Sequence, residues 1–375
     1  MASFVTGTAA TNVLVKIAFG TKLHRETQAR NFFMGQRGLV APDVGDEPTF
    51  EQKPSAPIIS SEDLNNKRAY EVRIGLSRAL TRNVSQGAGV RSLNSYTYGT
   101  TGMKDQEETM ILHYARAYVE QMKHATSFVT PELQDLRVQF KMKVVGANVL
   151  ADWMTREMEE ACLDAPYDKF SAHSTAGLSL TQADPPTANL KFANGKTDAA
   201  SMVTGDEITM MELRRMAAFC EVGPSGGQPL NPININNGAY FLLLLHPYNF
   251  NDLLANQEFR EVCIGGSVRG ETDSPYFKYA DARMFNILIY KYPRIRVSAT
   301  NADVRRLLLM GSNAIVQGVT ARPHLVERKE DDYGDVYGVG LKAINGWTRT
   351  DWIPDSGTTF NQSLAIWNVY TKSAA

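Results

Sequence analysis

The chain has 375 residues, of which 43% are hydrophobic and 21% charged, as in an ordinary folded protein with room for two or more packed units. Its 39 basic and 40 acidic side chains nearly cancel, so the composition gives no general attraction to nucleic acid. The longest purely apolar run, 239–245, is far shorter than the ~20 residues of a membrane span, and the uncharged start lacks a basic signal-peptide region. We therefore expect no membrane contact.

The first 66 residues divide into two segments of opposite charge. Residues 1–40 carry five basic residues against Glu26, a balance of +4, and residues 41–66 carry six acidic residues against Lys53, a balance of −5. Oppositely charged extended arms suit contacts between copies of one chain, although a solvated terminus shows the same pattern. The basic residues are Lys16, Lys22, Arg25, Arg30 and Arg37, and the acidic ones are Asp43, Asp46, Glu47, Glu51, Glu62 and Asp63.

The next segment predicts an extended hairpin. Residues 70–77 alternate apolar and polar side chains, which indicates a half-buried strand, and its partner is expected at about 108–121. Residues 81–104 between them are rich in Gly, Ser, Asn and Thr and cannot form a core of their own. Because so long a connection is usually functional or disordered, we expect a neighbouring molecule to bury this hairpin.

An unusually long helix is predicted over 131–164. Thr130 suits its N-cap, Pro131 its first position and Glu132 the positive end of its dipole. Apolar residues recur every three or four positions and form one face, and a second stripe indicates packing on another side. A coiled-coil or bundle helix is the alternative. The first face is Leu133, Leu136, Phe140, Val144, Ala147, Ala151, Met154, Met158 and Ala161, and the second stripe is Val138, Met142, Val145, Val149 and Trp153.

The second half predicts a mixed α/β unit. Residues 171–200 form a polar connection without periodicity and mark a boundary. Thr204 and Glu207 fit a capping box that opens a helix with the stripe Met210, Leu213, Ala217 and Cys220. Strands are expected at 240–245, 284–290, 294–297, 307–310 and 364–370, with a short helix at 249–262.

Three short strings look like catalytic or nucleotide-binding motifs. Residues 223–227 fit G-x-S-x-G, which would make Ser225 a nucleophile, but a helix precedes the string and prolines follow it, so a loop is favoured. Residues 338–343 fit G-x-G-x-x-A without a surrounding βαβ unit, so a strand pair with a turn is favoured. Residues 195–197 end like a phosphate loop, yet Leu190 stands where the first glycine belongs.

No residues point to a metal or cofactor. Cys162, Cys220 and Cys263 lack the spacing of a metal or redox site and are typical of reduced, mostly buried thiols. The six histidines have no metal-ligand spacing, and His246 before Pro247 fits a structural place at a strand-to-helix turn. The acidic run 327–335 fits a solvated turn better than a calcium loop, because the alternating ligand pattern is absent.

A series of short strings carries a family resemblance. In order along the chain these are Arg30-Asn31-Phe32-Phe33, residues 136–170, Leu245-His246-Pro247 continuing to Leu253, Leu308-Leu309-Met310-Gly311, Asp332-Tyr333-Gly334, Gly338-Val339-Gly340 and Ile344-Asn345-Gly346-Trp347. Together they cover about 30–350 and resemble the major capsid proteins of tailed bacteriophages. The specific resemblance is to the group related to N4-like podoviruses, which have the Hong Kong 97-type shell fold.

The resemblance implies an α+β fold with five parts. These are an N-terminal arm (1–68), an extended loop hairpin (69–128), a peripheral domain with a long spine helix and linker (129–200), a mostly axial domain (201–320) and return strands to the peripheral domain (321–375). It also implies a function in assembly, without catalysis or cofactors. Copies made in the bacterial host cytoplasm would form the icosahedral shell that encloses the double-stranded DNA of a tailed phage.

The implied partners are other copies of the chain in hexamers and pentamers, scaffold, portal and decoration proteins, and packaged DNA, which we expect to be held weakly and without sequence preference. The residues expected to contact other subunits are Arg73, Arg78, Arg82, Arg91, Tyr96, Tyr98, Glu107 and Glu108. The residues expected to face DNA are Lys16, Lys22, Arg25, Arg30 and Arg37.

Two alternatives remain at this point. An encapsulin-like compartment would share the fold but enclose a cargo enzyme, and a cargo gene in place of portal and terminase genes beside this one would favour it. A serine hydrolase would depend on Ser225, and its esterase activity would disappear in Ser225→Ala.

Overall fold

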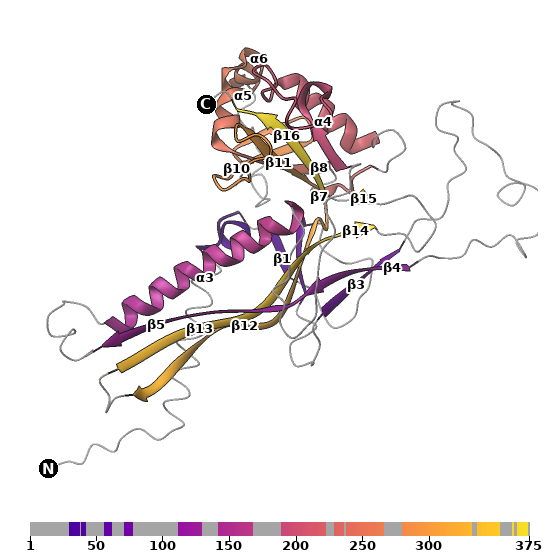
Figure 1. The fold of residues 1–375 in the computed structure, drawn as a ribbon. Helices are drawn as coiled ribbons and strands as arrows, with labels where there is room; N and C mark the ends of the chain where they lie inside the picture. Colours follow the sequence, from indigo (N-terminus) through magenta and orange to yellow (C-terminus); the bar gives the residue numbers. More distant parts are fainter. Residues whose placement is uncertain are drawn as a thin grey trace, which may run out of the picture.

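The computed structural model of the chain describes residues 30–37, 39–42, 56–61, 71–77, 112–129, 142–167, 189–222, 229–235, 238–265, 280–331, 336–352, 362–363 and 366–373. Two β-sheets organise these residues (Figure 1). An elongated sheet has one long helix lying along it, and a second, more compact sheet carries shorter helices. The expected mixture of helices and sheets is therefore confirmed.

The elongated sheet has five strands in the order β1-β2-β12-β13-β5. Its centre is the antiparallel pair of β12 (Ile315–Asp331) and β13 (Val336–Arg349), the longest strands of the fold. The short strands β1 (Val40–Pro42) and β2 (Ile58–Ser61) join parallel to β12. The other edge is β5 (Glu120–Val129), antiparallel to β13. Most of β5 was expected in the extended hairpin (69–128), but it pairs along its whole length with β13 of the elongated sheet.

The long helix, α3 (Met142–Tyr167), packs on this sheet, mainly over β13 and β5 (Figure 1). The first predicted apolar face is confirmed where the structure describes it, because Ala147, Ala151, Met154, Met158 and Ala161 are all buried. The predicted helix start at 130–141, with the remaining members of that face, lies outside the described residues.

Two details of α3 differ from the prediction. In the second stripe Val149 is 59% exposed, whereas Trp153 is half-buried and packs against the core, so the described residues cover only part of that side of the helix. The helix also continues past Asp164 and includes Pro166, although proline removes a helical N–H. Tyr167 holds this last turn, because its hydroxyl donates to the Arg306 carbonyl oxygen at 2.7 Å and its own carbonyl oxygen accepts from Arg306 Nη2 at 2.5 Å.

The extended hairpin is confirmed at its base. Strand β3 (Glu71–Ser77) pairs antiparallel with β4 (Leu112–Tyr118), from Glu71 opposite Tyr118 to Ser77 opposite Leu112. The connecting residues 78–111 lie outside the described residues. Because the strands are in register, both ends of that connection leave the same end of the hairpin.

The compact sheet has the order β6-β16-β11-β8-β10-β9, with β7 paired to β8. Its central strands β8 (Gly238–Leu245), β11 (Val304–Met310) and β10 (Ile287–Lys291) carry runs of fully buried residues, as expected of strands covered on both faces. The outer strands are β6 (Leu190–Phe192), β16 (Ile366–Lys372), β9 (Ala282–Met284) and β7 (Ile233–Ile235). A separate pair joins β14 (Asp351–Trp352) to β15 (Gln362–Ser363).

Several predictions for this half need correction. Residues 294–297 form only an isolated bridge from Val297 to Arg305 and not a strand. The predicted strand 284–290 is two strands, β9 and β10, joined by a tight turn at Phe285 with φ of 53°. The connection 171–200, expected to be irregular, contains β6 and a 3-10 turn, Ala193–Gly195. Residues 321–375 were expected to return together to one domain, but β16 pairs with β11 in the compact sheet.

The helices of the compact half are α4 (Met210–Val222), α5 (Pro247–Ala255) and α6 (Gln257–Gly265). Helix α4 begins five residues beyond Gly205, so the predicted cap at Thr204 is wrong. Thr209 caps it instead and accepts the Glu212 N–H at 3.4 Å, which is again a Thr-x-x-Glu pattern. The single helix predicted at 249–262 is two helices, because Asn256 leaves the helical conformation.

Candidate functional site: the arm, the long helix and the compact sheet

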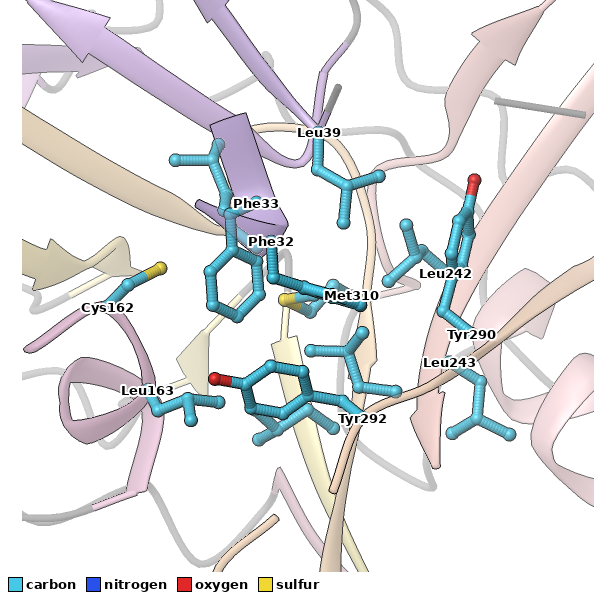
Figure 2. Close-up of a cluster of buried hydrophobic side chains, with 14 of the residues drawn as sticks. Phe32, Phe33, Leu39, Cys162, Leu163, Leu242, Leu243, Tyr290, Tyr292 and Met310 are labelled. Carbon is cyan, nitrogen blue, oxygen red and sulfur yellow. The ribbon is translucent and has the colours of Figure 1, made fainter. Parts of the chain in front are cut away.

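An N-terminal segment is wedged between α3 and the compact sheet (Figure 2). Residues Phe32–Gln36 form one turn of π-helix, and Phe32 and Phe33 are buried. Both rings pack on Tyr292, with centroids 4.5 Å and 5.5 Å away. Figure 2 also shows Leu163 of α3 and Met310 of β11 at this cluster. The arm segment therefore belongs to the hydrophobic core of its own subunit.

Glu159 of α3 is the polar centre of this region. Its side chain is only 8% exposed, and Oε1 accepts the backbone N–H of Phe32 at 2.7 Å. Its other oxygen, Oε2, accepts the Tyr292 hydroxyl at 3.2 Å and lies 3.5 Å from Arg294 Nη1. Burial, and then the Glu159 charge, raise the pKa of Tyr292, so its hydroxyl remains a donor. One carboxylate thus connects three segments that are distant in sequence.

A second set of ion pairs extends this connection along α3. Arg296 contacts Asp164 at 2.5 Å and Glu160 at 2.6 Å, and Arg294 lies 3.5 Å from Glu160. Burial alone would lower the pKa of Arg296, but the hydrogen bond and charge of Asp164 raise it, so the guanidinium stays charged. We call Glu159, Glu160, Asp164, Arg294 and Arg296, together with Tyr292, the joint. It fixes the last two turns of α3 to the segment between β10 and β11.

The two predicted DNA-facing residues that the structure describes have intramolecular partners. Arg37 Nη2 lies 3.2 Å from Asp281 Oδ2, and its guanidinium covers the rings of Phe32 and Tyr290. Arg30 forms an ion pair with Asp152 of α3 and keeps 43% of its side chain exposed. Lys16, Lys22 and Arg25 lie outside the described residues, so their assignment stays a prediction.

Most predicted subunit contacts also lie outside the described residues, namely Arg78, Arg82, Arg91, Tyr96, Tyr98, Glu107 and Glu108. Arg73 is in β3, directly opposite Arg116 of β4. No member of the joint was predicted from the sequence. A usable signal was present, because Arg294 and Arg296 stand two apart in an extended segment and α3 carries acidic residues beside its apolar face.

Of the three motif-like strings, the structure describes 338–343 and 195–197 but not 223–227. Residues 338–340 lie within β13, paired on both sides, so the favoured turn is absent and no phosphate loop forms there. Ser225 lies outside the described residues. His246 caps α5 by accepting the Tyr248 N–H at 3.2 Å, as the structural interpretation predicted. Cys162 and Cys220 are free and buried as expected, and the side chain of Cys263 lies outside the description.

The described part of the chain contains no group of His, Cys, Asp or Glu suited to holding a metal ion. Within the same residues, no helix has both the length and the apolar character needed to cross a membrane.

Comparison with known proteins identifies the class. The family model for "Phage capsid protein" matches residues 16–375, so the chain belongs to that family. Its architecture is the Hong Kong 97-type phage capsid fold, as the resemblance predicted, and the protein forms the shell of a phage head. A search of curated protein sequences found no match.

Several solved capsids are similar in structure. The capsid of Ralstonia phage GP4 has a TM-score of 0.67 at 16% identity, covering 89% of this chain and 95% of that chain. The cyanophage Pam1 capsid has a TM-score of 0.64 at 12% identity, covering 89% and 96%. The head of Helicobacter pylori bacteriophage KHP40 has a TM-score of 0.59 at 14% identity, covering 88% and 94%. At these identities the likeness concerns the fold alone.

Proposed function

We propose that copies of this chain assemble as hexamers and pentamers into the icosahedral head of a tailed phage related to the N4-like podoviruses, with no catalytic activity of their own. The observation that carries this proposal is the family match along nearly the whole chain. It also disfavours the two alternatives, an encapsulin-like compartment and a serine hydrolase. Synthesis and assembly would take place in the host cytoplasm, with scaffold, portal and decoration proteins as partners.

The difference between the packed core of the subunit and its separate β3–β4 hairpin supports an assembly role. The joint and the buried arm segment connect α3 to the compact sheet through a shared hydrophobic core, a buried hydrogen bond and ion pairs. The β3–β4 hairpin, by contrast, has its own two-stranded sheet outside the two larger ones. The described base of this hairpin contacts β13 and β12 of its own subunit. A two-stranded hairpin that continued beyond them would be marginally stable in water unless another molecule packed on it. We therefore assign residues 78–111 to contacts between subunits.

Contact with packaged DNA would be weak in this proposal. A container must hold a polyanion without gripping it, because each phosphate neutralised by Lys or Arg adds salt-dependent affinity that impedes packaging and ejection. The chain's 39 basic and 40 acidic residues suit that need. Lys16, Lys22, Arg25 and the exposed part of Arg30 are the residues we assign to such contacts.

Deleting residues 86–101 tests the assembly role. We expect the subunit to fold, with far-UV circular dichroism and melting temperature close to wild type, because the deleted residues would contact only other subunits. Assembly should fail, which sedimentation and electron microscopy would reveal. A matched control is the full chain carrying Ser95→Ala within the same segment, which should assemble normally. Intact shells from the deletion variant would show that the hairpin is not an interface element.

A further inference from the structure

A row of basic side chains crosses the face of the elongated sheet that α3 does not cover. In the sheet register, Lys342 of β13 stands directly opposite Lys123 of β5 on one side and His324 of β12 on the other. Residues directly opposite in an antiparallel pair point to the same face. We call these three residues the basic row.

Burial shows which face this is. Leu341 and Ala343, the neighbours of Lys342 along β13, are fully buried in the core to which α3 contributes. Because side chains alternate along a strand, Lys342 points to the opposite face, where it is half-buried and Lys123 is exposed. On β5, His124 packs on Trp153 of α3, with ring centroids 4.9 Å apart. Its neighbour Lys123 therefore points to the face away from α3, like Lys342.

The row has no counter-charge in the described part of its own subunit. On β5 and β13 the nearest residues on the same face, Gln121, Ala125, Gly340 and Ile344, are uncharged. Among the described residues neither Lys123 nor Lys342 takes part in an ion pair. Like charges directly opposite one another destabilise a sheet, and partial burial strengthens their repulsion. An unpaired row of this kind would be stabilised by an anionic partner.

We propose that the basic row binds the acidic segment 43–51 of a second copy of the chain in the assembled shell. This inference rests on the proposed function, because it requires copies to lie side by side. The segment carries Asp43, Asp46, Glu47 and Glu51, the densest acidic part of the first 66 residues. Its charge is opposite to that of the row, and carboxylate–ammonium contacts favour the correct pairing of surfaces.

The strand that precedes the acidic segment and the strand on which the basic row ends are the two edge strands of one sheet. The acidic segment follows β1, which is one edge strand, and the basic row ends on β5, which is the other. In rings of identical subunits each contact is heterologous, so it joins two different surfaces of the chain, as a contact between the acidic segment and the basic row requires.

The first experiment removes the charge of the row and keeps its length. In Lys123→Met/Lys342→Met we expect the isolated subunit to melt about 1–3 °C higher, because the repulsion is gone. The concentration needed for assembly should rise about tenfold or more, because the partner segment loses its counter-charge. The control Lys123→Arg/Lys342→Arg keeps the charge and should match wild type in both measurements.

The second experiment exchanges the charges. Lys123→Glu/Lys342→Glu should abolish assembly, and adding Asp46→Lys/Glu47→Lys to the same chain should restore it. Normal assembly of the methionine variant would overturn the inference, while wild-type shells would still uphold the proposed function. A lower melting temperature of the isolated methionine variant would also overturn it, because the row would then be paired within its own subunit. The inference would also be overturned if the charge exchange failed to restore assembly and the glutamate variant no longer bound a labelled DNA duplex. DNA would then be the partner of the basic row.

Discussion

Replacing Glu159 with alanine is expected to lower the free energy of unfolding by ~2–6 kcal/mol, because two donors in the core each lose their acceptor at a cost of ~1–3 kcal/mol. The carboxylate serves the Phe32 N–H, the Tyr292 hydroxyl and Arg294 together, and Phe32 and Tyr292 are both buried. Its removal leaves the Phe32 N–H and the Tyr292 hydroxyl without an acceptor in the core, whereas Arg294 keeps Glu160 as an acidic neighbour. Because proteins are stable by only ~5–15 kcal/mol in total, the isolated subunit should unfold at a much lower denaturant concentration.

Two variants separate this effect from a general effect on the helix. Glu157→Ala changes an exposed acid of α3 two residues away and should shift stability by no more than ~0.5 kcal/mol. Glu159→Gln keeps an oxygen for the Phe32 N–H but loses the charge, so it should fall between wild type and Glu159→Ala. Equal denaturation midpoints for Glu159→Ala and Glu157→Ala would show that the joint does not stabilise the fold.

Gly146→Pro is the second change with a large expected effect. Gly146 is buried within α3, and proline there removes the hydrogen bond to the carbonyl of Met142 and clashes with it. The cost of ~3 kcal/mol or more should yield insoluble or unassembled subunits. Expression yield, circular dichroism and sedimentation of the soluble fraction would measure it.

The control for this variant is Asn148→Ala, an exposed position in the same turn where alanine favours the helix. It should express and assemble like wild type. Normal yields of normal particles from Gly146→Pro would contradict a continuous helix through this position.

The periodicity of apolar residues predicted the features that depend on residues close in sequence, namely helix faces and regular strands. The 3.6-residue repeat of α3 identified Ala147, Ala151 and Met158 as buried, and the alternation at 70–77 located β3. The ends of helices were less predictable. Both Thr204 and Thr209 are followed three residues later by Glu, but Asn194 binds the Gly205 carbonyl oxygen and the Asp206 carboxylate, and the helix begins only beyond them with Thr209 as its cap. Local sequence does not contain that information.

The strands of the elongated sheet were the hardest to predict, for identifiable reasons. β12 changes register against β13 between Val319 and Ala321 and again between Ala321 and His324, so its side chains do not keep the period of two. β5 lacks an apolar alternation because the positions that face α3 include the polar residues His124 and Thr126. Neither pattern resembles a regular strand until the partner strand is known.

The joint depends on long-range contacts alone. Glu159 and Tyr292 are 133 residues apart in sequence, and Phe32 is 127 residues from Glu159. No spacing rule links residues at such separations. The class of the protein was nevertheless predictable, because the order of short strings from Arg30-Asn31-Phe32-Phe33 to Ile344-Asn345-Gly346-Trp347 is a property of the whole chain.

Electron microscopy of the purified protein after assembly tests the central claim most directly. The account predicts closed icosahedral particles in which the compact sheets surround the five-fold and six-fold axes and the β3–β4 hairpin of each subunit reaches a neighbouring copy. Monodisperse monomers or dimers that never close into shells, under conditions where the subunit is folded, would contradict it.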